Sequence, residues 1–485
     1  MNFGKIGSFI LDQEFAQLAV SQALRAGAEY AEARVQGDRG HTYTLKNGSP
    51  EPVTIARSLG IGVRVIVDGA MGFASTNSLD KSQLARVTEA AVRTAKASRN
   101  LLVSPIRLSE EKTWDDNWEA GMNVDVEGIS AEKKFELLFT IEKSLAQEKV
   151  HVSLPSRILV FDEELTEKVY ANSNGTRLHG FVPRLSLLYY ITAEQPGKGI
   201  VQRIHHLAQS CGWEVVDDWR PSEIAAEDAR SLGTLLREGV APPKEEVDVV
   251  LGPEVTGIIC HESCGHPQEA DRILGREAAQ AGESYIKPNM LGHRVGSERV
   301  TIIDDPTLPK SYGYYKYDDE GVKAGPRTLI KEGVIAGFLH NRETAAELGT
   351  TSNGASRSSA YDREPIIRMG NTYMKPGDYL FEELVEGVKH GVYLKNFMEW
   401  NIDDRRYNQR YVGLEAYMIE DGRVTVPVRN PILEITTPGL YGSVDAVGKH
   451  LEFSGATCGK GDPMQGAPVW TGGPAIRLRG IHLGG

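Results

Sequence analysis

Apolar residues recur along this chain with two periods, and each period predicts a different kind of element. Phe15, Leu18, Ala19 and Leu24 fall on one stripe and predict an amphipathic helix at 11–27. Further helices are expected at 79–98, 131–147 and 221–237. Alternation of apolar and polar residues predicts short strands, the first two at 30–36 and 41–46, with a hairpin turn at Asn47-Gly48.

The segment from Gly60 to Ala74 is rich in glycine, yet we interpret it as a β-hairpin. Its residues alternate, and Asp68-Gly69 has the composition of a hairpin turn. The glycines do not have the dinucleotide-binding spacing in front of a helix. A phosphate-binding loop is therefore not expected here.

The middle of the chain predicts strands near 156–161 and 167–172, joined across Glu163-Glu164. Asn174-Gly175 then turns the chain into a strand pair that contains Leu185 to Ile191. Pro242-Pro243 marks the expected domain boundary, because paired prolines end regular elements. Later hairpin signals stand at Glu332-Gly333, Asn353-Gly354 and Asp421-Gly422.

These elements predict an α+β fold with more than one domain. The tail from 452 to 485 contains nine glycines, which suits tight turns near a ligand or metal better than a helix. We expect an N-terminal helix and β-hairpin domain and a larger, strand-rich C-terminal domain. The expected division is 1–105, a central α+β domain at 106–240, and 241–485.

Composition narrows the class of protein. The chain has 485 residues, 40% of them hydrophobic and 25% charged, as in an ordinary globular protein. A net charge of −12 argues against nucleic acid or an anionic membrane as the main partner. Met1 to Val20 does not have the pattern of a signal peptide, and no apolar run is long enough to span a membrane. With four cysteines and no disulfide framework, the cytoplasm is the expected location.

The stretch His261-Glu262-Ser263-Cys264-Gly265-His266 carries the candidate chemistry. Imidazole nitrogens are good Zn²⁺ ligands, and a carboxylate beside them can act as general base. Val247 to Leu251 is predicted to be a buried strand, and Pro253 suits the first turn of a helix that ends in these residues. The alternative is two histidines on a partly buried helix, satisfied by backbone carbonyls.

The two histidines are five residues apart, where zinc peptidase helices commonly have four. On a regular helix this spacing separates the side chains by about 140°. A single turn with i→i+5 hydrogen bonds would realign them, and such turns favour functional sites. We therefore predict a distorted helix, with the distortion least costly at Gly265.

A catalytic zinc usually has three protein ligands, so one more is needed. We interpret Cys260 and Cys264 as small buried hydrophobes, because four ligands from one helix would leave no position for water. Glu269 and Asp271 are each a possible ligand or a partner of an imidazole. Cys458 is predicted to lie in a glycine-flanked turn. Spacing alone does not decide between Cys458 and Glu269.

The chain resembles the TldD/PmbA (TldD/TldE) family along nearly its whole length. Gly60–Ala74 is similar to the family's N-terminal hairpin, and His261–Asp271 to its metal helix. Further matches are Asp318-Asp319-Glu320-Gly321, Arg368 to Tyr373 with Pro376-Gly377, and Thr457-Cys458-Gly459-Lys460. TldD-type members are zinc metallopeptidases, whereas the companion type, PmbA (TldE), lacks the metal motif. Because the motif is complete here, the resemblance places the chain with the TldD type.

The resemblance implies that His261, His266 and Cys458 hold Zn²⁺ and that Glu262 is the general base. It also implies cleavage of peptides or unfolded segments, possible maturation of peptide precursors, and a dimer that encloses the active site. The second subunit is either identical or a metal-free TldE/PmbA-type paralogue. A different class of function is a peptide-binding or regulatory protein with a structural metal, since the family was once described as modulating DNA gyrase. That alternative leaves Glu262 and the open metal position without a purpose.

Overall fold

The computed structural model describes residues 11–149, 151–277 and 282–485, and a long curved sheet dominates its first half. In this sheet β1 lies between β3 and β6, β4 pairs with β3, and β7 pairs with β6. Both β5 and β8 pair with β7, and β2 pairs with β1. The strands are β1 (Tyr30–Lys46), β2 (Ser49–Pro50), β3 (Thr54–Val67), β4 (Ala70–Thr76), β5 (Asp115–Glu119), β6 (Ser153–Asn172), β7 (Arg177–Gln195) and β8 (Gly199–Gln209).

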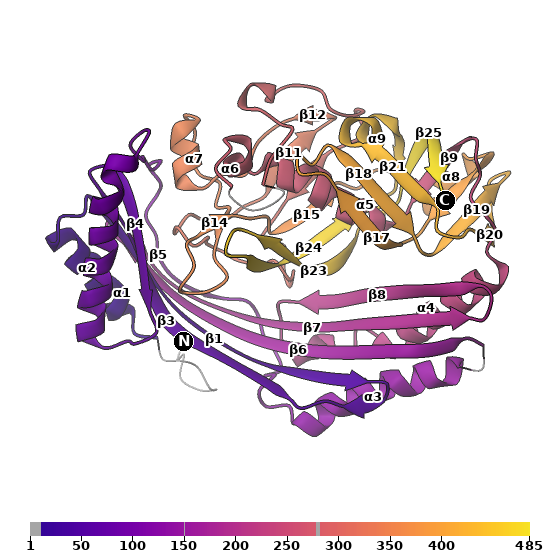
Figure 1. Cartoon of the computed structure of the whole chain (residues 1–485), viewed down its shortest axis with the longest axis horizontal. Coiled ribbons are helices and arrows are strands. Elements are labelled where there is room, and N and C mark those ends of the chain that lie inside the picture. Colours follow the sequence, from indigo (N-terminus) through magenta and orange to yellow (C-terminus); the bar gives the residue numbers. More distant parts are fainter. Residues whose placement is uncertain (1–10, 150, 278–281) are drawn as a thin grey trace.

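Four helices cover the outer face of this sheet, and two separate apolar cores lie beneath them (Figure 1). At one end α1 (Gln13–Arg25) and α2 (Lys81–Ser98) pack on β1, β3 and β4. At the other end α3 (Ala131–Glu148) and α4 (Pro221–Glu238) pack on one another and on β6, β7 and β8. These four helices agree with the predicted ranges to within about two residues at most ends.

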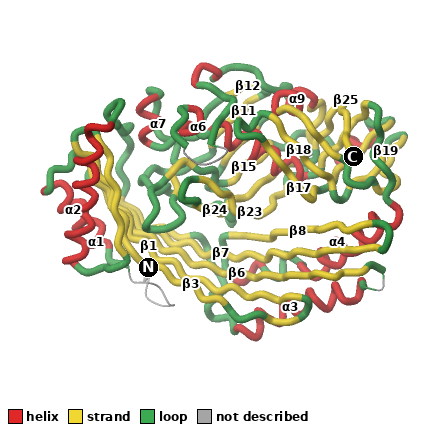
Figure 2. The backbone as a smooth tube through the Cα atoms, in the orientation of Figure 1, coloured by secondary structure: helices red, strands yellow, loops and turns green. Residues whose placement is uncertain are grey.

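The C-terminal half lies on the concave side of the long sheet and contains two further sheets (Figures 1 and 2). One has the order β12-β11-β10-β15-β24-β23. Its strands are β10 (Ile302–Asp304), β11 (Arg327–Lys331), β12 (Val334–Ile335), β15 (Asn371–Met374), β23 (Glu452–Lys460) and β24 (Gln465–Gly473). Helix α5 (Pro253–Cys260) packs on β15, β23 and β24, which places its C-terminal end beside the β23–β24 hairpin.

The other sheet has the order β17-β18-β21-β25-β9-β16-β19-β20, with β22 beside β25. Its strands are β9 (Glu246–Leu251), β16 (His390–Leu394), β17 (Phe397–Ile402), β18 (Asn408–Gly413), β19 (Ala416–Glu420), β20 (Arg423–Pro427), β21 (Ile432–Thr436), β22 (Val444–Val447) and β25 (Ile476–Gly484). Outside these sheets lie the strand pair β13 (Ser356–Arg357) and β14 (Ile366–Ile367), the helices α6 (Ala270–Ile273), α7 (Arg342–Glu347), α8 (Phe381–Glu386) and α9 (Thr437–Ser443), and several single helical turns. The α+β class is confirmed.

The two halves are joined by buried ion pairs as well as by the chain. Arg64 of β3 pairs with Glu32 of β1 at 2.7 Å and with Glu320 of the C-terminal half at 2.5 Å. The backbone N–H of Arg342 donates to the other oxygen of Glu320. The predicted Asp318-Asp319-Glu320-Gly321 signature therefore contacts the N-terminal strands and fixes the C-terminal half against them.

Several predicted turns are correct. Asp68-Gly69 connects β3 to β4, and both residues have positive φ, as a two-residue hairpin turn requires. Asn174-Gly175, Glu332-Gly333 and Asp421-Gly422 also connect paired strands. The predicted division into three domains stays a prediction, although strands from both sides of residue 105 belong to the same sheet.

Two predicted breaks between strands are wrong. The strands predicted at 30–36 and 41–46 are one strand, β1, and those at 156–161 and 167–172 are one strand, β6. Glu163-Glu164 is not a turn, because the two side chains lie on opposite sides of one continuous strand. Glu163 contacts Lys134 and His41, whereas Glu164 faces the concave side.

Asn353-Gly354 does not form a hairpin either. The Asn353 side chain accepts from the backbone N–H of His340 and donates to the carbonyl of Phe338, so it stabilises an irregular loop. The glycine-rich tail, predicted to favour turns, contains the three nine-residue strands β23, β24 and β25.

The prediction about Met1 to Val20 lies partly outside the described residues, which begin at 11. Within the described ranges, none of the helices has the length and apolar character needed to cross a lipid bilayer.

Candidate metal centre

The end of α5 has the distortion that the histidine spacing predicts. Residues His261–Gly265 form one π-helical turn, in which the N–H of His266 donates to the carbonyl of His261, five residues earlier. This turn brings the two imidazole rings to 4.8 Å between centroids, at 80° to one another. The predicted i→i+5 turn is confirmed.

Gly265 is required in this turn because there is no room for a side chain at this position. Its φ of −57° is ordinary for a helix, so conformational freedom is not the reason for a glycine. A Cβ atom at this position would overlap the sulfur of Met369, a fully buried residue. The turn is also held from outside, because the Tyr441 hydroxyl donates to the carbonyl of Ile259 at 3.2 Å.

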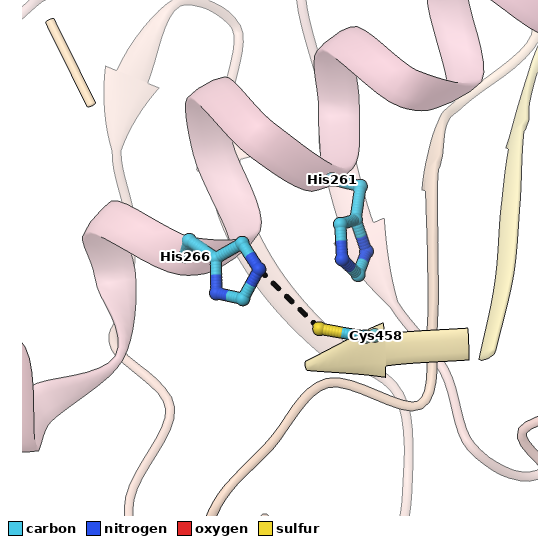
Figure 3. Close-up of side chains that lie close together, drawn as sticks. All are labelled: His261, His266 and Cys458. Carbon is cyan, nitrogen blue, oxygen red and sulfur yellow. Dashed lines mark hydrogen bonds between the residues drawn. The ribbon is translucent and has the colours of Figure 1, made fainter. Parts of the chain in front are cut away.

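The β23 strand presents Cys458 to the two histidines (Figure 3). Its sulfur lies 3.3 Å from Nε2 of His266, and the candidate ligand atoms of His261, His266 and Cys458 all lie within 4.8 Å of one another. All three residues are buried. Among the described residues this is the one group of three or more His, Cys, Asp or Glu that has metal-binding geometry.

The electrostatics distinguish Cys458 from the other cysteines near α5. Burial opposes ionisation of Cys458, but His266, Arg368 and His261 hold its pKa well below the ordinary value. Burial raises the pKa of Cys260 and of Cys264, so both remain neutral thiols in the apolar core. Their interpretation as small hydrophobes agrees with this packing.

The chemistry of these donors fits a zinc ion. Two imidazoles and a thiolate are common zinc ligands, and three protein ligands leave a position for water. In addition, Nδ1 of His261 is buried and has no hydrogen-bond partner within the described part of the chain. A buried ring nitrogen without a partner is costly unless something binds it. That these residues hold zinc stays a prediction.

Glu269 and Asp271 belong to a second layer around the site. Glu269 is fully buried, and it accepts from Nδ1 of His266 at 3.0 Å and from Nε of Arg272 at 2.6 Å. Lys460, two residues after Cys458, contacts Glu269 at 3.2 Å and Asp271 at 2.7 Å. Glu269 therefore orients His266, and Lys460 connects the cysteine strand to the histidine helix.

Glu262 lies beside the histidines and is nearly buried. Its carboxylate pairs with the guanidinium of Arg406 at 2.5 Å. Arg406 is in the turn between β17 and β18, has a positive φ of 63°, and its carbonyl accepts from the Thr437 hydroxyl. Sequence reasoning did not identify Arg406, because no motif or spacing links this turn to residues 144 positions earlier.

The sequence matches a known protein family and several known proteins along most of its length. Residues 31–95, 125–236 and 244–485 match, in order, domain 1, the central domain and the C-terminal domain of the PmbA/TldA metallopeptidases. A metalloprotease of Methanocaldococcus jannaschii is 31% identical over 94% of this chain and 97% of its own. A zinc metalloprotease TldD homolog of Saccharolobus solfataricus is 26% identical over 96% of this chain and 99% of its own.

The fold is also similar to a solved structure. The crystal structure of TldE from Thermococcus kodakarensis has a TM-score of 0.75 to this chain. The alignment covers 97% of this chain and 100% of the other, at 19% identity. At this level of identity, the similarity establishes a shared fold.

Proposed function

The chain belongs to the PmbA/TldA (TldD/PmbA) family of metallopeptidases, and we propose that it is a zinc-dependent peptidase. In this proposal His261, His266 and Cys458 hold the zinc ion. The observation that carries the proposal is the convergence of these three residues from the π-helical turn after α5 and from β23, with Glu262 beside them. Removing any one of the three is expected to weaken metal binding.

Each residue of the site then has a role in hydrolysis. A bound zinc ion supplies a Lewis acid for the scissile carbonyl and a lowered pKa for water. Glu262 accepts the proton of the attacking water and later delivers it to the leaving amine. Arg406 holds the Glu262 carboxylate in one orientation, and Glu269 fixes the ring of His266. Because a thiolate donates more charge than an imidazole, the site suits slow and selective cleavage.

The proposed substrates are peptides or unfolded segments, including peptide precursors, and they would bind in an extended conformation. Main-chain hydrogen bonds to a strand edge would supply affinity with little side-chain selectivity. Selection would come from a dimer, formed with an identical subunit or with a metal-free TldE/PmbA-type paralogue, that encloses the site. The similarity of this fold to that of TldE supports pairing between two subunits of one fold. The four free cysteines support a location in the cytoplasm.

Chelation tests this proposal. The protein, loaded with zinc, is assayed on an unstructured peptide before and after treatment with a chelator, and again after zinc is restored. We expect cleavage to disappear and return, while circular dichroism and oligomeric state stay unchanged. Cleavage that persists without zinc contradicts the proposal. Loss of the fold on chelation favours the structural metal of a regulatory protein instead.

A further inference from the structure

A second site lies on the other side of the β23 strand from the metal centre. It is a cavity of about 260 Å³ between the concave face of the long sheet and the β23–β24 hairpin. Thr457 lines it, whereas the next residue, Cys458, points to the histidines. Successive side chains of a strand point to opposite faces, so one strand separates the two sites. Figure 1 shows the hairpin above the middle of β6 and β7 and the C-terminal end of β8.

Three arginines line this cavity, and each is more than nine-tenths buried. Arg184 comes from β7, Arg357 from β13, and Arg368 precedes β15. Their hydrogen bonds go to backbone carbonyls: Arg184 to Tyr312 and Tyr314, Arg357 to Met369 and Pro468, and Arg368 to Gln465 and Cys458. Nε of Arg368 has no partner among the described residues.

In the part of the chain that the structure describes, these three arginines lack a carboxylate partner, whereas several other buried arginines have one. Among the described residues, no carboxylate oxygen lies within ion-pair distance of Arg184, Arg357 or Arg368. Elsewhere in the interior, Arg64 pairs with Glu32 and Glu320, and Arg327 with Asp304. A buried cation is costly unless an anion accompanies it, so three together indicate a missing negative charge.

The acidic residues of the cavity form no ion pair with these arginines among the described residues, although Asp319 favours the charged form of Arg357 from a longer distance. Asp319 is paired with Lys168 at 2.9 Å and accepts from the N–H of Ser358. Asp318 accepts from three backbone N–H groups. Glu164 lies directly across from Arg184 in the β6–β7 register but forms no ion pair with it within the described chain, and burial raises its pKa although Arg184 opposes the rise.

The two neighbouring guanidinium groups affect the ionisation of Arg357. Burial, together with Arg184 and Arg368, lowers the pKa of Arg357 to about 10. Arg357 therefore stays charged at neutral pH, but at a cost that a bound anion would remove. Its guanidinium lies 5.0 Å from the centre of the Tyr315 ring.

We propose that this cavity binds the carboxylate group of a peptide, as a free C-terminus or as an acidic side chain. Guanidinium groups recognise carboxylates through paired, charge-assisted hydrogen bonds. The rings of Trp118, Tyr312 and Tyr315 offer apolar contact to the residue that bears the carboxylate. The volume is below the roughly 300–1,000 Å³ of sites for drug-sized ligands, so about one or two residues fit. The choice of a peptide rests on the proposed peptidase function.

Calorimetric titration of the full-length protein tests the proposal. The probes are acetyl-Gly-Phe with a free carboxylate, the same peptide with a C-terminal amide, and acetyl-Gly-Asp-Phe amide. Titrations use the zinc-loaded Glu262→Gln variant, which prevents turnover, and are repeated after chelation. We expect the free acid or the Asp-containing amide to bind at least about tenfold more tightly than the neutral amide. The tighter of the two identifies the source of the carboxylate.

Two charge-removing variants, Arg357→Gln and Arg184→Gln, should weaken that binding on the order of tenfold or more. Arg93→Gln, on the exposed face of α2, is the matched control and should leave it unchanged. If neither carboxylate-bearing peptide binds more tightly than the neutral amide, the proposal is overturned. This comparison does not depend on whether the arginine variants fold. If binding disappears on chelation, the peptide binds the zinc ion and not the cavity, and this result also overturns the proposal. Because titration does not depend on cleavage, failure of the peptidase assay is a separate result.

Discussion

The carboxylate of Glu262 and the guanidinium of Arg406 form an ion pair at 2.5 Å, although they are 144 residues apart in the chain. The pair connects the π-helical turn to the β17–β18 turn. Both side chains are close to nine-tenths buried, so water screens their interaction weakly. The proposed general base is therefore held in place by a cation that no sequence motif identifies.

Replacing this cation should impair catalysis and leave metal binding intact. For Arg406→Gln we expect kcat to fall on the order of tenfold to a hundredfold with little change in KM, because the carboxylate loses its fixed orientation. Arg406→Lys should recover part of the loss, since it keeps the charge. Steady-state kinetics and zinc content measure both effects. A variant that loses zinc to the same extent as activity would assign Arg406 a structural role.

Glu262→Gln should separate catalysis from metal binding. The variant is expected to retain about one zinc per chain and to lose peptidase activity by roughly 10²–10⁴-fold, the usual contribution of a general base. Elemental analysis and a peptide assay give the two quantities. Loss of zinc from this variant would mean that Glu262 is a ligand.

The four cysteines allow a matched test of the third ligand. Zinc content should fall sharply in Cys458→Ser and stay near wild type in Cys211→Ser, Cys260→Ser and Cys264→Ser. The controls are equally buried, so they report on the general effect of a buried hydroxyl. A similar loss of zinc in the Cys260 or Cys264 variant would favour a ligand cluster on the helix.

Gly265→Ala tests the packing of the π-helical turn. The added methyl group overlaps Met369, and overpacking of this kind costs about 1–3 kcal/mol. We expect lower thermal stability and weaker zinc binding. Combining it with Met369→Ala should restore zinc binding in part, because that change frees the space. If Gly265→Ala alone binds zinc normally, the close packing of residue 265 against Met369 is not required for the geometry of the turn.

Acid should weaken the packing of α4 on the long sheet through Asp228. Burial alone would raise the pKa of Asp228, but Arg203 and His205 lower it to about 2, below the ordinary 3.8. A lowered carboxyl pKa stabilises the fold above pH 3.8, and that stability is lost as the pH falls through 2. This shift corresponds to about 2 kcal/mol.

Urea unfolding of wild type and Asp228→Asn measures this contribution. The difference in unfolding free energy should be largest near neutral pH and shrink between about pH 4 and pH 2. A difference that is independent of pH would assign the effect to the shape of the side chain and not to its charge.

The sequence predicted those features of the site that depend on local spacing. The spacing of five positions from His261 to His266 requires an i→i+5 turn if both bind one ion, and the turn is present. Cys458 lies 192 residues from His266, and spacing alone did not separate it from Glu269. Only the resemblance to a family selected it, because tertiary contacts between distant segments leave no periodic signal.

The errors also have physical causes. Glu163-Glu164 resembled a break in a strand because two adjacent carboxylates usually lie in solvent. In the fold, one pairs with buried Lys134, and the other lies opposite Arg184 on the concave face. Arg406, Arg184 and Arg357 were missed for a related reason, and Arg368 was noted only as part of a family motif. Their significance depends on which acids are near them, and that is decided by the tertiary fold.

The distance along the chain between the histidines and the cysteine also affects when the enzyme becomes active during its synthesis. His266 leaves the ribosome 192 residues before Cys458, a delay on the order of 10 to 40 seconds at common rates of translation. During that interval the growing polypeptide has at most two of the three proposed ligands. On the proposed assignment, a nascent chain is therefore not yet a peptidase while its own unfolded segments are exposed to cleavage.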